Sequence, residues 1–436
     1  MYKVPNLVYA NDKGEIFDHP TLKMAVRSAN YDFVPYEGEL IRLPDCSRLY
    51  FMPDTRPMAY DQEAANLTEF KGGNAVSVFL PPGFLRLFLP AYRKTKDYIM
   101  PLYAYTAVGF LDGHFVVPAI QVDDISKWNP NNYDFSENFD KQVADFLDNN
   151  PKNRLYEQLA LCATKYHCTA AKNVFYPRWE CPMPTSPACN AGCIGCISLQ
   201  PSECCPSPQQ RLSFMPEPWE IADVALRHAE KAQDPIISFG QGCEGDPVLA
   251  ADNIAEAVKL IKKSMPSLTV NFNSNCSIPD KVKKVIDSGV DSVRVSLNSV
   301  VEETYNAYYR PRGYKFADVI KSIEHVKNAE VFLQLNLLMF PGVNDRAGEA
   351  AALLSFIDEY KVDLIQTRNL NIDAELLFSY LKFKPDELYG IKNLLKLIKK
   401  RRKEIQFGYF NRTKSDFYKN SGYPDLRPPK KGRSVI

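Results

Sequence analysis

Three cysteines stand close together at Cys189, Cys193 and Cys196, in the pattern Cys-x3-Cys-x2-Cys. The segment around them, SPACNAGCIGCISLQPSECC, holds five of the eleven cysteines of the chain. Thiols gathered this densely serve as disulfide partners, as zinc ligands or as ligands of an iron–sulfur cluster. The rest of the sequence discriminates between these three uses.

A disulfide framework is the least expected of the three. The N-terminal sequence MYKVPNLVYANDKGEIF has no charged region followed by an apolar run, so we expect no secretory signal. The most apolar segment, AVSVFLPPGFLRLFLPAY, is interrupted by Pro81, Pro82, Gly83 and Arg86, so we expect no membrane span. The sequence therefore predicts a cytoplasmic protein whose thiols stay reduced, and the odd number of cysteines agrees with this.

The spacing of the three cysteines favours an iron–sulfur cluster over zinc. A structural zinc site uses four ligands, and a ferredoxin cluster needs a fourth cysteine at a set distance. Three closely spaced cysteines leave one iron of a [4Fe–4S] cluster without a protein ligand, and an open iron is suited to catalysis. Further cysteines leave two alternatives open, a second cluster or packing as small hydrophobic side chains; they are Cys168, Cys181, Cys204 and Cys205.

The elements that must position the cysteine loop follow it as helix-then-strand units. Helical patterns precede apolar runs five times: WEIADVALRHAEKA and PIISF, ADNIAEAVKLIKKS and LTVNF, DKVKKVIDSG and SVRVSL, FADVIKSIEHVKNA and VFLQLNLLMF, AGEAAALLSFIDEY and VDLIQTRNL. These runs predict parallel strands that are apolar on both faces and covered by helices. With a first strand near Val174–Tyr176, they predict an α/β fold, a partial (β/α)6 barrel with the cysteine loop at the carboxyl end of that strand.

The remaining sequence divides by composition. Residues 1–150 show short β-branched and aromatic runs between turn signals, including a hairpin with LDGH as its turn, and predict a β-rich domain for recognising substrate or partner. A helical stretch is expected from Phe139 to His167. A linker with a helix and a Cys/Pro-rich loop is expected to occupy 151–188, and the barrel 174–411. The net charge is +1, so global charge does not indicate a nucleic-acid binder. Residues 412–436 form a basic, proline-rich tail, either solvated or in contact with RNA phosphates.

From Val174 to Asn411 the sequence resembles the radical S-adenosylmethionine (SAM) superfamily. The three-cysteine motif carries the resemblance, together with motifs at successive strand ends: SFGQGCEGDPVL, NFNSNCS, VRVSLNS, LNLLMFPGVND and QTRNLNID. Two positions depart from the family pattern. Gly195 stands where an aromatic residue often packs near the adenine, and the Gly-Gly-Glu-Pro turn appears as Glu244-Gly245-Asp246-Pro247.

The resemblance implies roles for individual residues. It implies that Cys189, Cys193 and Cys196 bind a [4Fe–4S] cluster whose open iron holds SAM. It assigns the SAM amine to the backbone at Gly245 and to Asp246, the ribose to Ser296 and Asn298, the cofactor or substrate to Asn336 and Asn369, and the SAM carboxylate to Arg294 or Arg368. Structural alternatives stay open, because Ser296 and Asn298 also suit a helix cap and Arg368 also suits a buried ion pair. Four residues suit either contact with an anionic substrate or burial against the barrel rim: Tyr308, Tyr309, Arg310 and Arg312.

The function implied by the resemblance is reductive cleavage of SAM to a 5′-deoxyadenosyl radical, which abstracts hydrogen from a substrate. The substrate is expected to be a protein or peptide, or an RNA. The electron is expected to come from a reductant such as flavodoxin or ferredoxin. The alternative function is that of an iron–sulfur electron carrier or scaffold that does not turn over SAM.

Overall fold

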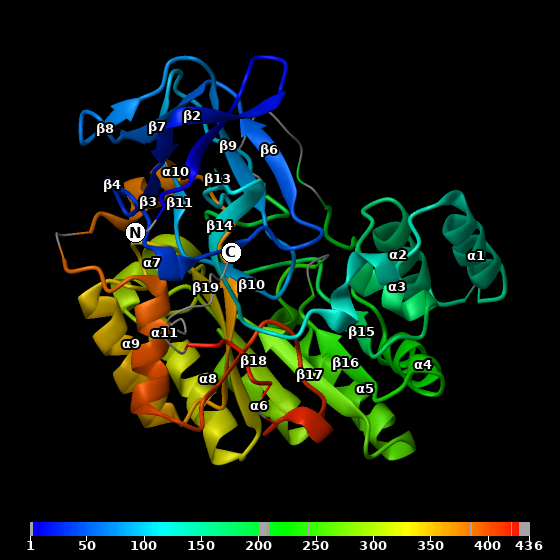
Figure 1. The fold of residues 1–436 in the computed structure, drawn as a ribbon. Coiled ribbons are helices and arrows are strands. Elements are labelled where there is room, and N and C mark those ends of the chain that lie inside the picture. Colours follow the sequence, from blue (N-terminus) through cyan, green and yellow to red (C-terminus); the bar gives the residue numbers. More distant parts are fainter. Residues whose placement is uncertain are drawn as a thin grey trace.

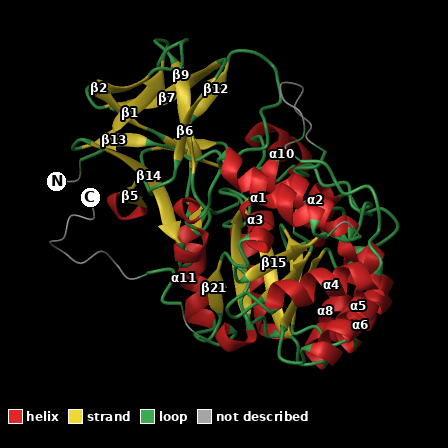
Figure 2. Cartoon of the chain, turned by 90° about the vertical axis from the view of Figure 1, so that its right-hand side faces the viewer, coloured by secondary structure: helices red, strands yellow, loops and turns green. Residues whose placement is uncertain are grey.

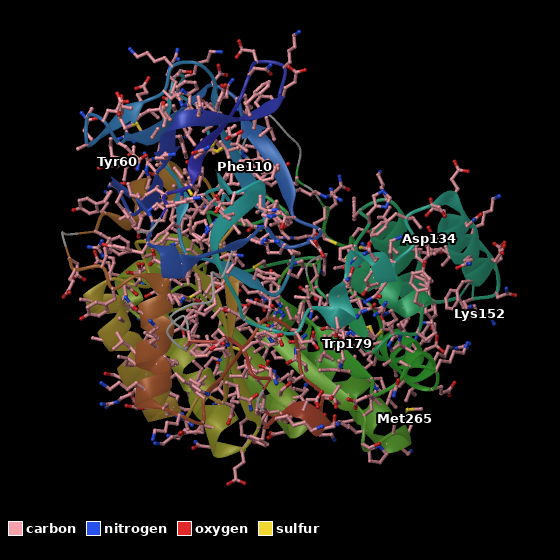
Figure 3. All side chains as sticks on the ribbon, viewed as in Figure 1. Tyr60, Phe110, Asp134, Lys152, Trp179 and Met265 are labelled. Atoms are coloured by element: carbon pink, nitrogen blue, oxygen red, sulfur yellow. The ribbon has the colours of Figure 1, made fainter. Side chains whose placement is uncertain are left out.

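The structure is a computed structural model of the chain, and it describes residues 3–150, 152–199, 207, 209–241, 244–383, 386–419 and 421–426. A β-rich N-terminal part lies against one end of a parallel sheet that is covered by helices (Figure 1). A small group of helices stands beside the two sheets, where Asp134 and Lys152 mark it (Figure 3). The same arrangement is visible from the side (Figure 2).

The N-terminal part is built from short antiparallel strands. Their bounds are β1 Asn6–Ala10, β2 Ile16–Met24, β3 Val26–Ser28, β4 Tyr31–Phe33, β5 Leu40–Arg42, β6 Arg48–Met52, β7 Thr55–Asp61, β8 Asn66–Glu69, β9 Asn74–Phe79, β10 Phe84–Arg86, β11 Leu89–Pro90, β12 Tyr92–Lys94, β13 Gly109–Leu111 and β14 His114–Gln121. The larger sheet follows the order β10-β14-β13-β1-β2-β7-β12. The predicted LDGH hairpin is confirmed, because β13 pairs with β14 and both Asp112 and Gly113 have positive φ, as a type I′ turn requires.

The helical stretch expected from Phe139 to His167 is divided into two helices, α1 (Glu137–Asp148) and α2 (Arg154–Thr164). Each helix begins at a residue whose side chain caps it. The Ser136 side chain accepts a hydrogen bond from the Asn138 amide, and the Asn153 side chain accepts one from the Leu155 amide. A third helix, α3 (Thr169–Phe175), follows.

The first strand of the parallel sheet was wrongly predicted. Residues 174 and 175 of the expected strand lie in α3, and the strand is β15, Glu180–Met183. Phe175 packs edge-on against Phe139 with ring centroids 6.3 Å apart, and Val174 is buried. Packing against α1 therefore overrides the β-propensity of this aromatic run.

The parallel sheet has seven strands in chain order. They are β15, β16 Ile236–Phe239, β17 Thr269–Ser274, β18 Ser292–Leu297, β19 Phe332–Met339, β20 Leu364–Asn369 and β21 Gln406–Gly408. The intervening helices are α4 Pro218–Ala229, α5 Ala251–Ser264, α6 Pro279–Asp287, α7 Glu302–Tyr309, α8 Phe316–Asn328, α9 Ala347–Tyr360, α10 Ala374–Leu381 and α11 Ile391–Arg401. The predicted α/β fold with a parallel sheet is thus confirmed, with β21 as an additional short strand. Among the described residues, no helix combines the length and apolar character needed to cross a bilayer.

One face of this sheet is polar, which corrects the expectation of strands apolar on both faces. Outward residues such as Val293, Val295 and Leu335 pack into the main hydrophobic core. Inward residues pair across neighbouring strands in polar rows, Asn273 with Arg294 and Gln334, and Ser296 with Asn336 and Gln366. All of the inward positions are largely buried. The concave interior of the sheet therefore has the composition of a binding site, because buried polar groups need partners.

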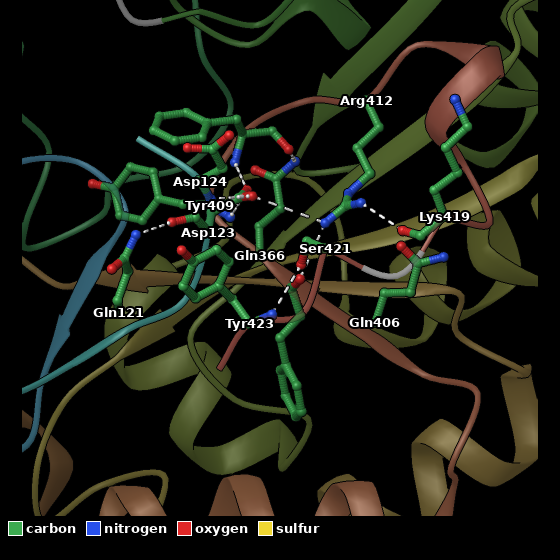
Figure 4. Close-up of polar contacts among 12 residues, drawn as sticks. Gln121, Asp123, Asp124, Gln366, Gln406, Tyr409, Arg412, Lys419, Ser421 and Tyr423 are labelled. Carbon is green, nitrogen blue, oxygen red and sulfur yellow. Dashed lines mark hydrogen bonds and ion pairs between the residues drawn. The ribbon is translucent and has the colours of Figure 1, made fainter. Parts of the chain in front are cut away.

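The segment after β21 spans the concave side of the sheet between its two edge strands, β15 and β21. The Asn411 side-chain amide donates to Glu180 Oε1 on β15 at 2.6 Å and to Ser238 Oγ on β16 at 3.0 Å. The N-terminal part holds this segment in place, because the Asp123 carboxylate accepts from the Tyr409 and Phe410 amides at 2.8 and 3.1 Å (Figure 4). Both parts of the chain therefore shape the interior.

A second contact joins β10 to the carboxyl end of β20. Asn369 accepts from the Arg86 amide at 2.9 Å and donates to the Phe84 carbonyl at 2.8 Å. The Arg86 guanidinium is fully buried and donates to the Leu370 carbonyl at 2.6 Å, and its burial lowers its pKa to about 9. Asn369 was expected to face cofactor or substrate, but its side chain joins the two parts of the protein.

Candidate functional site

The cysteine loop leaves β15 and is tied to the end of β16 by a buried carboxylate. Glu244 accepts hydrogen bonds from the Thr185 amide and hydroxyl, the Ser186 amide and the Gly240 amide, at 2.8 to 3.0 Å. Burial raises the pKa of Glu244 to about 7, and the hydrogen bonds to Thr185 and Ser186 oppose this rise. No motif of the sequence assigned a role to Glu244. The one signal for it was an acidic residue in Glu-Gly-Asp-Pro, the turn that differs from the family pattern.

Gly245 brings the backbone of this turn against the cysteine loop. Its amide donates to the Ser186 carbonyl at 2.6 Å, and the next amide, of Asp246, donates to the Ala188 carbonyl at 2.9 Å. A Cβ atom on Gly245 would lie 1.8 Å from the Ala188 oxygen. Only glycine permits this approach, so position 245 fixes the residue that precedes Cys189.

A cavity of about 240 Å³ opens between the cysteine loop and the carboxyl ends of the strands. Its lining includes all three cysteines of the motif together with polar residues from four strand ends. From the expected site it contains Cys189, Cys193, Cys196, Gly245, Asp246, Ser296 and Asn336. Asn298, Arg294 and Arg368 do not line it. The structure thus brings the thiols together with most, not all, of the residues expected to hold SAM.

The environment of the three thiols suits metal ligands. The Ala191 amide lies 3.4 Å from Cys189 Sγ, Arg211 Nη2 lies 3.6 Å from Cys196 Sγ, and the Ser198 hydroxyl lies 3.2 Å from the same sulfur. Such donors stabilise sulfur ligands and tune iron–sulfur clusters. Burial, then the nearby Asp246 carboxylate, raises the pKa of Cys189 to about 11. Burial also raises the pKa of Cys193, so a bound cation is needed to hold these groups as thiolates.

The donor set fits a cluster better than a single ion. Within the part of the chain that the structure describes, no group of three or more His, Cys, Asp and Glu side chains is placed to hold one metal ion. In a [4Fe–4S] cluster each cysteine binds a separate iron, so its sulfurs surround the cluster and do not converge on one point. Three thiols that border one cavity meet this requirement.

Asp246 lines the cavity, and its carboxylate links the segment after β16 to the end of β17. Its carboxylate accepts from the Val248 amide at 3.0 Å, the Ser274 hydroxyl at 2.6 Å and the Asn275 amide at 2.7 Å. Burial raises its pKa, and these three donors oppose the rise. An ionised carboxylate has about four acceptor positions, so one position is left for a ligand donor such as an amine.

The residues expected at the ribose are placed differently from one another. Ser296 donates to Asn273 Oδ1 at 3.3 Å, and the Asn336 amide donates to the Ser296 hydroxyl at 3.3 Å. Asn336 Oδ1 is buried and has no hydrogen-bond partner, so it is open to a ligand donor. Asn298 instead donates to the Thr304 carbonyl, within the first turn of α7, at 3.2 Å. It does not cap this helix, whose N-cap is Val301 without a side-chain hydrogen bond.

Tyr308 fills the space beside Gly195. A Cβ atom at position 195 would lie 2.8 Å from the Tyr308 hydroxyl oxygen. The end of α7 is joined to the cysteine loop, because the Gly192 and Ile194 amides donate to the carbonyls of Tyr309 and Tyr308 at 2.8 and 3.1 Å. Tyr308 lines the cavity. The aromatic ring beside position 195 thus comes from a helix about 110 residues further along the chain, which local sequence motifs do not reveal.

The remaining cysteines lie apart from the cavity or outside the described residues. Cys181 is fully buried in β15, and burial raises its pKa. Cys168 precedes α3, and burial, with Cys162 nearby, raises its pKa. Cys204 and Cys205 lie outside the described residues, so a second cluster stays a hypothesis. Burial of Cys162 and Cys181 fits their alternative role as small hydrophobic side chains.

The chain is similar to known proteins over part of its length. Residues 183–354 match the family described as the radical SAM superfamily. The FeMo cofactor biosynthesis protein NifB of Klebsiella pneumoniae is 26% identical over 187 residues, which cover 39% of this chain and 40% of that protein. A probable GTP 3′,8-cyclase of Aeropyrum pernix is 26% identical over 179 residues, covering 41% and 47%. The chain thus spans less than half the length of these relatives. The solved structure of native anSMEcpe with bound AdoMet is 18% identical over 44% of this chain and 52% of that one, with a TM-score of 0.35.

Proposed function

We propose that this chain, a member of the radical SAM superfamily through its domain at residues 183–354, is an enzyme that cleaves SAM reductively and uses the resulting radical on a substrate. Members of the superfamily use a [4Fe–4S] cluster and SAM. When bound, these cofactors supply an electron and a 5′-deoxyadenosyl group able to remove a hydrogen atom from an unactivated carbon. The chain itself must bind, orient and shield them.

The observation that carries the proposal is the number of thiols at the cavity. Among its described lining residues there are three cysteines, Cys189, Cys193 and Cys196. They would hold three irons and leave the fourth open. The same cavity carries the Asp246 carboxylate and the unpartnered Asn336 oxygen, which are acceptors suited to the SAM amine and to a ribose hydroxyl.

Several residues would hold the bound cofactor in place without taking part in the reaction. Glu244 and Gly245 fix the path of the cysteine loop. Tyr308 would cover the base in place of an aromatic residue at position 195, and Ser296 would share the ribose hydroxyls with Asn336. The electron would come from flavodoxin or ferredoxin in the cytoplasm, where thiols stay reduced. A protein or peptide and an RNA both remain proposed substrates.

The test is anaerobic reconstitution with iron and sulfide, reduction with dithionite, and chromatography for 5′-deoxyadenosine and methionine after SAM is added. We expect both products from the wild type and neither from Cys193→Ala. The matched control is Cys46→Ala, which removes an exposed cysteine of the N-terminal part and should leave the yield unchanged. A cluster that forms and reduces but leaves SAM intact would replace the proposal with the electron-carrier function.

A further inference from the structure

The interior of the parallel sheet holds two guanidinium groups beyond the cysteine cavity, Arg294 on β18 and Arg368 on β20. Neither forms an ion pair with any residue that the structure describes. Arg294 is only 3% exposed, and Arg368 is partly buried. Placing positive charge in a protein interior is costly unless an opposite charge accompanies it. These two positive charges therefore have no negatively charged partner among the described residues.

Arg294 is held by three hydrogen bonds from its Nε and Nη1 atoms. Its guanidinium donates to the side-chain oxygens of Asn273, Gln366 and Asn411, at 2.9, 2.7 and 2.9 Å. Burial, and then the positive charge of Arg368, lowers its pKa to about 9. Arg294 thus acts as a fixed positive charge that Arg368 faces.

Arg368 has fewer partners. With the residues that the structure describes it makes one hydrogen bond, from Nη2 to Gln366 Oε1 at 3.1 Å, and its guanidinium carbon lies 4.1 Å from the centroid of the Tyr409 ring. Its Nε atom is buried and has no hydrogen-bond partner. A guanidinium that lies over an aromatic ring and keeps N–H donors without partners is suited to bidentate binding of a carboxylate or a phosphate.

The position of Arg368 connects it to the cavity. Arg368 pairs with Leu338 on β19, and residues paired on neighbouring strands point to the same face of a sheet. Leu338 and Asn336 line the cavity. A ligand that leaves the cavity past Leu338 therefore meets Arg368.

One acidic side chain of the interior, Glu180, attracts Arg294 and partly opposes the lowering of its pKa, but forms no ion pair with either arginine. Glu180 lies at the opposite edge of the sheet, on β15, and its Oε1 accepts from Gln241 at 2.8 Å and from Asn411 at 2.6 Å. Neither guanidinium therefore has a described carboxylate in direct contact. A bound anion would supply that contact.

We propose that the substrate carries an anionic group, a carboxylate or a phosphate, which binds to Arg368. The inference rests on the proposed function and names the class of its substrate. SAM is the other possible source of a carboxylate. Its amine and carboxylate share one carbon, however, and the amine is expected at Gly245 and Asp246 beyond β16. Arg368 lies on β20, four strands further along the sheet, which favours the substrate.

The test uses the reconstituted protein with SAM bound and measures thermal unfolding in inorganic phosphate and in acetate, with ionic strength held constant by chloride. We expect a saturable rise in the unfolding temperature for the wild type, of roughly 1–2 °C at ten times the dissociation constant. In Arg368→Gln the apparent affinity should fall at least tenfold, and Arg368→Lys should keep weaker binding because it retains the charge. Arg401→Gln, which removes an exposed arginine paired with Asp358, is the control and should match the wild type.

Binding of labelled SAM by equilibrium dialysis separates the two sources of the anion. A SAM affinity within twofold of wild type in Arg368→Gln supports a substrate anion. A loss of tenfold or more assigns the guanidinium to the SAM carboxylate and overturns the proposal. So does the lack of a saturable anion effect in the wild type, or an equal effect in Arg368→Gln. Neither measurement needs turnover, so failure to form 5′-deoxyadenosine would refute the proposed function separately.

Discussion

Replacing Gly245 with alanine tests whether close backbone contact positions the cysteine loop. The new Cβ would lie 1.8 Å from the Ala188 oxygen and 2.3 Å from its carbonyl carbon. Because Cβ contacts under 3.0 Å essentially do not occur, the two backbones must separate by at least 3.0 − 1.8 = 1.2 Å. Cys189 is the next residue, so it must move with the loop.

The energetic cost of this change has two parts. Overpacking costs about 1–3 kcal/mol. The hydrogen bonds from the Gly245 and Asp246 amides to Ser186 and Ala188 are stretched, and each contributes about 1 kcal/mol. We therefore expect Gly245→Ala to lower the free energy of unfolding by about 3–5 kcal/mol.

The assay is the iron content after reconstitution, together with the absorbance of the cluster. The wild type should hold about four irons per chain, and Gly245→Ala less than half of that amount. Gly348→Ala is the matched control, because a Cβ at this position of α9 meets no atom closer than 3.5 Å. If Gly245→Ala retains full iron and an unchanged spectrum, the contact does not position the loop and the reasoning is wrong.

Three further predictions concern the surroundings of the site. Gly195→Phe should reduce SAM affinity in equilibrium dialysis because its side chain collides with Tyr308, and adding Tyr308→Ala should restore it; a double variant as weak as the single one would contradict this. Burial raises the pKa of the Asp345 carboxyl from 3.8 to about 6, so the folded protein favours the protonated form. The stabilisation of the folded state by Asp345 is therefore fully present below pH 3.8 and is lost as the pH rises through 6. Relative to Asp345→Asn, the wild type should lose about 3 kcal/mol of unfolding free energy between pH 3.5 and pH 7. If denaturation gives the same pH dependence of the unfolding free energy for both proteins, burial does not raise the pKa of Asp345. Asn369→Ala should cost about 2 kcal/mol in urea unfolding, because it breaks both hydrogen bonds to β10, while Asn393→Ala on the surface of α11 should cost almost nothing.

Periodic patterns predicted most of the parallel sheet, because apolar strands between amphipathic helices leave a strong signal. The helix expected at ADNIAEAVKLIKKS has the observed bounds of α5, Ala251–Ser264. The three cysteines were predicted from spacing alone to act together, and the structure places them at one cavity. Local sequence was sufficient for these features.

What the sequence did not predict depends on contacts between distant segments. The aromatic run at Val174–Tyr176 was expected as a strand because its packing on α1 is invisible to propensity. Tyr308 beside Gly195, and Asn369 bound to β10, join segments more than a hundred residues apart. The polar face of the parallel sheet was also not predicted, because its inward residues alternate along each strand with apolar residues and the strands were interpreted as apolar on both faces.

The central claim is that the three-cysteine motif leaves one iron open for SAM. The most direct measurement is electron paramagnetic resonance of the dithionite-reduced protein, recorded with and without SAM. The account predicts a reduced [4Fe–4S] signal whose g-values change when SAM binds, in the wild type and in Cys46→Ala. A reduced cluster whose signal is the same with saturating SAM would contradict it, because no iron would then be open to the cofactor.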